Sequence, residues 1–218
     1  YSVKHSNVRK WTKPIKYYFI HRVADQALHE RLSKLHLKHL AKITGVDIYP
    51  VTKKQDANLL IVFSTENQLE QELLSEFKIK STKQRHQLFR NSVCLAHFSI
   101  NANSSINKAI VVIPVDRARA HAKLVSCIVE ELTQIMGLPN DSEKVFPSIF
   151  NDKSYNELLT GLDYLLLRML YHPTVKSGMS ELRVSPVLQK IMTIFDRQGV
   201  IAQAEEKVME GELYPLLY

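Results

Sequence analysis

The sequence predicts an α/β fold in which helices pack on a twisted, mixed sheet. Strand-like and helix-like segments alternate through the first half of the chain, and glycines are few, with 6 among 218 residues. Residues 58–64 form a continuous apolar run, which is typical of a central strand covered on both faces. With 45% hydrophobic residues, the chain is long enough to bury a substantial core.

The first half begins with a polar, basic lead-in over residues 1–10, which we expect to be flexible. Pro14 precedes a run of aromatic and branched residues that predicts a strand over residues 13–20. Leucines at helical spacing then predict a long helix from Ala24 to Gly45, where the glycine ends it. The other segments predicted here are a strand at 46–51, a helix at 68–77, an exposed loop at 81–91, and strands at 93–100 and 109–115 joined by residues 101–107.

The second half is predicted to be mainly helical. One helix begins near Asp116, a suitable N-cap residue, and ends at Gly137. Another begins at Thr160, which has the spacing of a capping box with Asp163, and continues to Tyr171. A helix at 186–195, an amphipathic segment at 202–210 and an apolar tail at 213–218 follow. We expect one domain over residues 1–180, on which residues 181–218 pack as a helical extension.

Two histidines of the long helix could share a metal ion, because His36 and His39 are three residues apart. They are flanked by Lys34 and Lys38, and the sequence places no carboxylate or third ligand close to them. We therefore interpret both as surface histidines.

The composition argues against a specific nucleic-acid-binding protein and against a membrane-spanning segment. The net charge is +7, but lysines and arginines are scattered and do not alternate with aromatic residues, so no specific nucleic-acid site is expected. No run approaches the roughly 20 apolar residues that span a bilayer. A weak attraction to anionic lipids, to cell-wall polymers or to nucleic acid stays open.

The two cysteines, Cys94 and Cys127, belong to no metal-binding motif. In a reducing compartment they would be two buried thiols. In an exported protein they could pair and close a loop of roughly thirty residues.

The stretch around which the chain is organised is residues 127–141. Glu130 and Gln134 are four apart and therefore project from one face of a helix, with Glu131 beside them. Gly137 ends the helix, and Asn140 follows on the turn. Such a group is either a solvated helix face or the remnant of a site.

The stretch resembles the metzincin zinc-peptidase motif H-E-x-x-H-x-x-G-x-x-H, with all three histidines replaced. Ser148-Ile149-Phe150 is similar to the metzincin Met-turn, and Leu159-Thr160-x-x-Asp163 to the segment that leads the closing helix. With Trp11-x-x-Pro14-Ile15, these motifs resemble the bacterial family called domain of unknown function 2927, which is similar to metzincins. The resemblance implies an active-site-type helix, C-terminal helices and a metzincin-like domain over residues 1–180.

The resemblance places Glu130, Gln134 and Asn140 at the zinc-ligand positions, Glu131 at the catalytic glutamate and Phe150 at the Met-turn methionine. These oxygen donors suit zinc poorly and Ca²⁺, Mg²⁺ or Mn²⁺ better. We therefore expect no cofactor; if one is bound, we expect it to be one of these divalent cations or weakly bound zinc. The resemblance also implies an exported protein, periplasmic, attached to the outer membrane or secreted, and it favours a Cys94–Cys127 disulfide.

Three functions are open at this point. The first is a non-catalytic relative of the peptidases that binds a peptide, a protein or a cell-envelope component. The second is an active metal-dependent hydrolase with Glu131 as general base. The third is an interaction protein that uses the apolar tail at 213–218, although packing of that tail on its own core is the favoured interpretation.

Overall fold

The computed structural model describes residues 7–75, 81–83, 92–151 and 153–217. Its sheet has the order β1–β6–β4–β2–β3, and β5 pairs with β6. All pairings are parallel except β5–β6, which is antiparallel, so the predicted mixed sheet and α/β fold are confirmed. The strands are β1 (Lys10–Trp11), β2 (Ile15–His21), β3 (Ile48–Pro50), β4 (Leu59–Ser64), β5 (Leu95–Ile100) and β6 (Ser105–Pro114).

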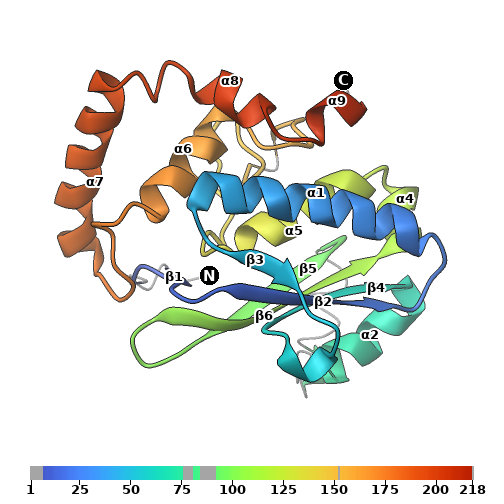
Figure 1. Cartoon of the computed structure of the whole chain (residues 1–218). Coiled ribbons are helices and arrows are strands. Elements are labelled where there is room, and N and C mark those ends of the chain that lie inside the picture. Colours follow the sequence, from blue (N-terminus) through green and yellow to red (C-terminus); the bar gives the residue numbers. More distant parts are fainter. Residues whose placement is uncertain (1–6, 76–80, 84–91, 152, 218) are drawn as a thin grey trace.

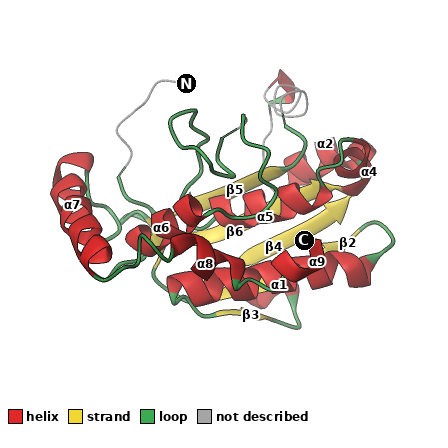
Figure 2. Cartoon of the chain, turned by 90° about the horizontal axis from the view of Figure 1, so that it is seen from above, coloured by secondary structure: helices red, strands yellow, loops and turns green. Residues whose placement is uncertain are grey.

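Helices lie on both faces of the sheet (Figure 1). They are α1 (Gln26–Thr44), α2 (Glu66–Ser75), α4 (Val115–Ala120), α5 (Leu124–Gln134), α6 (Gly161–Leu170), α7 (Glu181–Arg197), α8 (Ala204–Met209) and α9 (Tyr214–Leu217), with the 3₁₀ helix η1 (Lys54–Asp56). The long α1 and the shorter α5 cover one face, and α2 lies on the other. Figure 2 shows α1, α5 and α6 over the strands, with α7 at one end. None of the described helices is both long and apolar enough to cross a bilayer.

The sheet has a core on each face. On β4, Ile61 and Phe63 belong to the main core under α1 and α5, whereas Val62 belongs to a second core with Leu69 of α2. This alternation follows from the two-residue period of a strand. The continuous apolar run that predicts a central strand is confirmed.

The long helix matches its prediction, but its histidines do not. Gly45 has φ 71° and caps α1, and its N–H donates to Ala41 O at 2.8 Å. His36 and His39 are only 1% and 7% exposed, so the interpretation as surface histidines is wrong. Their side of α1 is covered by α5 and by the C-terminal segment, which the flanking lysines do not reveal. The rings occupy that interface, where His39 lies so close to Gly211 that any side chain there would collide with it.

Several element boundaries also differ from the prediction. The helix expected from Asp116 is two helices, because Ala122 turns the chain at φ 55° between α4 and α5. Asp116 does not cap it; its Oδ1 accepts from Glu66 N–H at 2.8 Å, at the start of α2. Strand β6 begins at Ser105, inside the expected connection, and Pro186 lies within α7 instead of beginning it.

Trp11, near the start of the described chain, and Leu213, near its end, belong to the same core. Lys10, expected in a flexible lead-in, forms part of β1 and is buried, while residues 1–6 are outside the described residues. Of the expected loop at 81–91, only 81–83 are described, and residues 76–77 of the expected helix at 68–77 also lie outside the described part. In the tail, Leu213 is buried in the main core and the Tyr214 hydroxyl donates to Leu159 O.

Cys94 and Cys127 form a disulfide, as the resemblance implies, with a Cα–Cα distance of 5.8 Å. The bond joins the start of β5 to α5 across 33 positions of sequence. In the chain-entropy estimate, a loop of this length contributes about 4 kcal/mol to stability. One side of α5 is thereby attached to the sheet.

The buried histidines predict a stability that falls in acid. Burial is the main cause that lowers the pKa of His36 to about 3 and that of His39 to about 4. The unfolded chain takes up these protons near pH 6.5, before the folded one, so their contribution is complete above pH 6.5 and is lost as the pH falls toward the folded values. Together they should remove about 3 kcal/mol of unfolding free energy between pH 6.5 and 5.

Urea denaturation at pH 5, 6 and 7 measures this effect. The double variant His36→Gln/His39→Gln should lose about 2 kcal/mol less stability per pH unit than the natural chain over this range. His121→Gln, at an exposed position, serves as the control and should leave the pH dependence unchanged. Identical pH dependences in the double variant and the natural chain would contradict the assignment.

Candidate functional site

The C-terminal end of α5 is buried, and two aromatic residues cap it. Trp11 Nε1 donates to Ile135 O at 2.8 Å, and the Tyr171 hydroxyl donates to Met136 O at 2.8 Å. Trp11 N–H in turn donates to the Tyr171 oxygen at 3.2 Å. Because the last carbonyls of a helix have no partner within it, these donors satisfy groups that would otherwise be buried without hydrogen bonds. The sequence marks Trp11 only through the family resemblance and Tyr171 only as the end of a predicted helix, and the capping role of both is not evident from it.

Gly137 turns the chain away from this end. Its φ of 117° is unfavourable for a residue with a side chain, and a Cβ atom there would collide with the Arg9 carbonyl. The segment before β1 therefore packs directly against the turn. The predicted glycine turn is confirmed, and its cause includes a close backbone approach that the sequence does not reveal.

One amide joins the helix to the residues after the turn. Gln134 Nε2 lies 3.3 Å from Glu130 Oε1 and 3.2 Å from Asp141 Oδ1, and can donate one hydrogen to each. The contacts therefore link Glu130 and Gln134, two of the three predicted ligand positions, to Asp141. The third, Asn140, is exposed and borders an adjacent pocket.

Glu131 lies beneath this group. Its side chain is 7% exposed, and its pKa is raised well above the usual range, first by burial and then by the nearby carboxylates of Glu130 and Asp141. Both causes favour the protonated, neutral form. The carboxyl group for which the resemblance predicts a catalytic position is thus held in an environment that opposes its ionisation.

The donors at this place fit a zinc ion poorly. Glu130, Gln134 and Asn140 provide one negative charge and no imidazole or thiolate, and one amide hydrogen of Gln134 already points to each neighbouring carboxylate. Among the described residues, no three histidine, cysteine, aspartate or glutamate side chains are grouped so that they could hold a metal ion.

Residues 148–150, for which the resemblance predicts a Met-turn, are attached to α6 by Asp163. The carboxylate, which is fully buried, accepts from the Ser148 hydroxyl at 2.5 Å, from Ile149 N–H at 3.1 Å and from Thr160 N–H at 2.8 Å. The capping box predicted for Thr160 and Asp163 is confirmed. Burial nevertheless outweighs these hydrogen bonds and raises the pKa of Asp163. The sequence signals each motif separately, but not their contact.

A pocket of about 380 Å³ opens beside the turn, between the exit from α5 and α6. We call it the turn pocket. Its lining is mostly apolar and comprises Leu138, Pro139, Val145, Phe150, Leu166 and Leu170, with Arg9 and Asn140 among its polar members. Phe150 is 3% exposed and so forms part of both the core and the pocket wall. A pocket of this size and character suits an apolar side chain or a small ligand.

A protein-family model matches most of the chain. The model of the family described as "Protein of unknown function (DUF2927)" matches residues 1–190, which include the whole of α5, the turn and α6. A search of the curated proteins finds no match.

The turn predicts a strong dependence on Gly137. Gly137→Ala should reduce the free energy of unfolding by about 4 kcal/mol, because it adds backbone strain and a collision with the Arg9 carbonyl. Gly45→Ala is the matched control: its φ is 71° and nothing lies within 4 Å of the added atom, so the loss should be about 1–2 kcal/mol. Urea denaturation of the two variants compares them, and equal losses would contradict this account of the turn.

Proposed function

The chain belongs to the DUF2927 family, and we propose that it is a non-catalytic binding protein of the bacterial cell envelope, built on a frame that resembles the metzincin peptidases. In this proposal, the turn pocket receives an apolar side chain of a peptide or protein partner. The residues at the former ligand positions stabilise the turn that forms one wall of the pocket.

The arrangement of Gln134 carries the proposal. Its amide lies between the carboxylates of Glu130 and Asp141, at 3.3 and 3.2 Å, so the group is hydrogen-bonded internally. A catalytic zinc site needs ligands with free lone pairs and an open position for water. The buried Glu131, with its raised pKa, likewise favours a structural carboxyl over one that is ionised at neutral pH.

The pocket itself supports binding. Leu138, Val145 and Leu166 are partly exposed at its wall, whereas Phe150 is buried beneath them. Phe146, which directly follows the pocket-lining Val145, is a large aromatic side chain that is 66% exposed. Exposed aromatic groups beside an apolar pocket are typical of surfaces that bind other proteins. The disulfide is in keeping with the exported location that the family resemblance implies.

One observation favours a second candidate, an active hydrolase that uses Glu131 as general base. A raised pKa is also what a glutamate needs in order to accept a proton near neutral pH. Bound cations near Glu130 and Asp141 would oppose the repulsion that contributes to this shift. The two candidates differ in metal content and in cleavage.

Metal content and peptide cleavage test the proposal. Protein purified without chelator or affinity metal should contain well under one metal ion per chain by elemental mass spectrometry. It should also cleave no member of a mixed fluorogenic peptide library, with or without added zinc. Near-equimolar metal together with cleavage that disappears in Glu131→Gln would contradict the proposal and favour the hydrolase.

Peptide binding tests the turn pocket directly. Binders selected from a random peptide library should contain a large apolar residue, and Leu166→Arg should weaken their binding at least tenfold because it places a charge in the pocket wall. Leu182→Arg is the matched control at an 89% exposed position of α7 and should bind as the natural chain does. Equal effects of the two substitutions would exclude the turn pocket as the binding site.

A further inference from the structure

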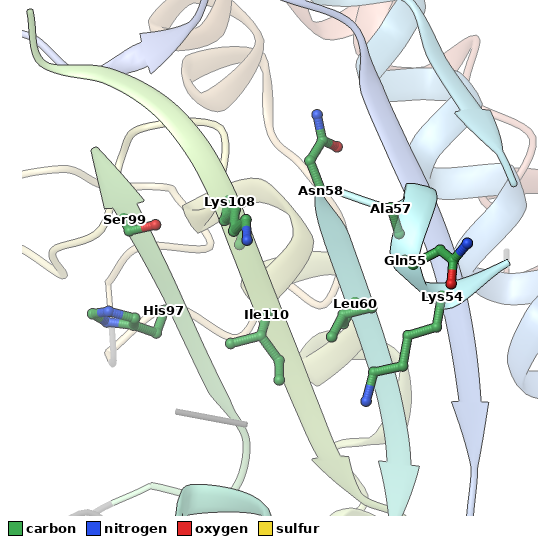
Figure 3. A pocket seen from close by; sticks show the side chains of 10 residues that line it. Lys54, Gln55, Ala57, Asn58, Leu60, His97, Ser99, Lys108 and Ile110 are labelled. Carbon is green, nitrogen blue, oxygen red and sulfur yellow. The ribbon is translucent and has the colours of Figure 1, made fainter. Parts of the chain in front are cut away.

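A larger hollow lies on the sheet face opposite α1 and α5, and we call it the sheet groove. It has a volume of about 680 Å³ and extends from η1 across β4 and β6 to β5 (Figure 3). Leu60 and Ile110 form its floor, with Lys54 and Gln55 on one side and His97 and Lys108 among the other lining residues. Alternation along β4 and β6 places Leu60 and Ile110 on the face of Val62 and Val112, away from the main core.

The groove is built into the fold. Asn58 fixes its edge, because its Oδ1 accepts from Lys16 N–H at 2.7 Å and its Nδ2 donates to Pro14 O at 2.9 Å. At the opposite edge, the Ser99 hydroxyl donates to Asn107 Oδ1 at 2.8 Å. These bonds connect both sides of the groove to neighbouring backbone and side chains.

The charge of the lining has one sign. Lys54 and Lys108 contribute ammonium groups, and none of the described lining residues is acidic. Within the described part of the chain, no carboxylate forms an ion pair with Lys108. A concave site with positive charge over an apolar floor attracts an anion that also has apolar groups.

We propose that the sheet groove binds a short acidic peptide segment of a partner protein. The Lys108 ammonium group pairs with a carboxylate of the peptide, Leu60 and Ile110 contact its aliphatic side chains, and the Gln55 amide hydrogen-bonds to its backbone. A volume of about 680 Å³ lies within the range that holds a drug-sized ligand, and a peptide of a few residues is of that size.

Two other anionic partners fit the groove less well. A membrane surface is bound by apolar side chains that protrude into it, whereas Leu60 and Ile110 lie at the floor of a hollow. Single-stranded nucleic acid requires several aromatic stacking platforms along a basic channel, and His97 is the one aromatic ring among the described lining residues. A peptide uses the apolar, amide and ammonium groups together.

Fluorescence anisotropy with two labelled pentapeptides tests this inference. One alternates glutamate with valine, and the other carries glutamine in place of each glutamate. The acidic peptide should bind at least tenfold more tightly than its neutral counterpart, and its affinity should fall as salt is raised. Lys108→Glu should weaken binding of the acidic peptide at least tenfold.

Matched variants separate this site from general charge effects and from the turn pocket. Lys190→Glu makes the same charge change on α7, outside the groove lining, and should bind the acidic peptide as the natural chain does. Lys108→Gln, a milder change at the same exposed position, should also weaken binding. Leu166→Arg should leave it unchanged.

Four outcomes would overturn the inference: no binding of the acidic peptide at millimolar concentration, equal affinity for the two peptides, equal binding by the Lys108→Glu and natural chains, or binding to phosphatidylglycerol vesicles without binding to the peptide. Since the turn pocket is tested by Leu166→Arg and by apolar peptides, failure at the sheet groove leaves the proposed function standing.

Discussion

The end of α5 is buried, and its last carbonyl groups need donors from elsewhere in the protein. Trp11 and Tyr171 supply them, from segments 160 positions apart in the sequence. This requirement brings the start of the sheet and the end of α6 to the same place. Gly137 then allows the chain to leave beside the Arg9 carbonyl, and the turn pocket forms between that exit and α6. The site is therefore a consequence of how one helix ends.

The same constraint explains the chemistry around the predicted ligand positions Glu130 and Gln134. A helix held between a disulfide at Cys127 and a buried contact from Thr133 to His36, at 2.9 Å, has little freedom to rotate. Glu131 is thereby kept under the carboxylates of Glu130 and Asp141, and its environment favours the neutral form. In a peptidase, imidazole ligands and a cation would compensate such a cluster. In this chain, the amide of Gln134 links the two outer carboxylates.

Sequence patterns predicted the elements better than their contacts. Strand β4, helix α1 and the Thr160 cap depend on local periodicity and capping, which the sequence displays directly. The burial of His36 depends on α5, about 90 residues later in the chain, and polar neighbours conceal it. The break between α4 and α5 depends on Ala122, which has a left-handed backbone conformation. Nothing in the sequence indicates that an alanine adopts this conformation here. For the site, the spacing of Glu130, Gln134 and Gly137 in the sequence predicted a helix and the turn after it. It did not predict the contact of Asp141 or the sheet groove, because both arise from tertiary packing.

The protonation state of Glu131 tests the central claim most directly. ¹³C-NMR titration of the glutamate carboxyl carbons, with Glu131→Gln used to assign the signal, measures its pKa in the folded protein. The account predicts a value well above the ordinary 4.5 and a carboxyl that remains protonated at pH values where other glutamates have ionised. A Glu131 carboxyl that titrates at or below 4.5 would contradict the structural role assigned to it. Such a pKa would require a positive charge beside the carboxyl group, such as a bound cation.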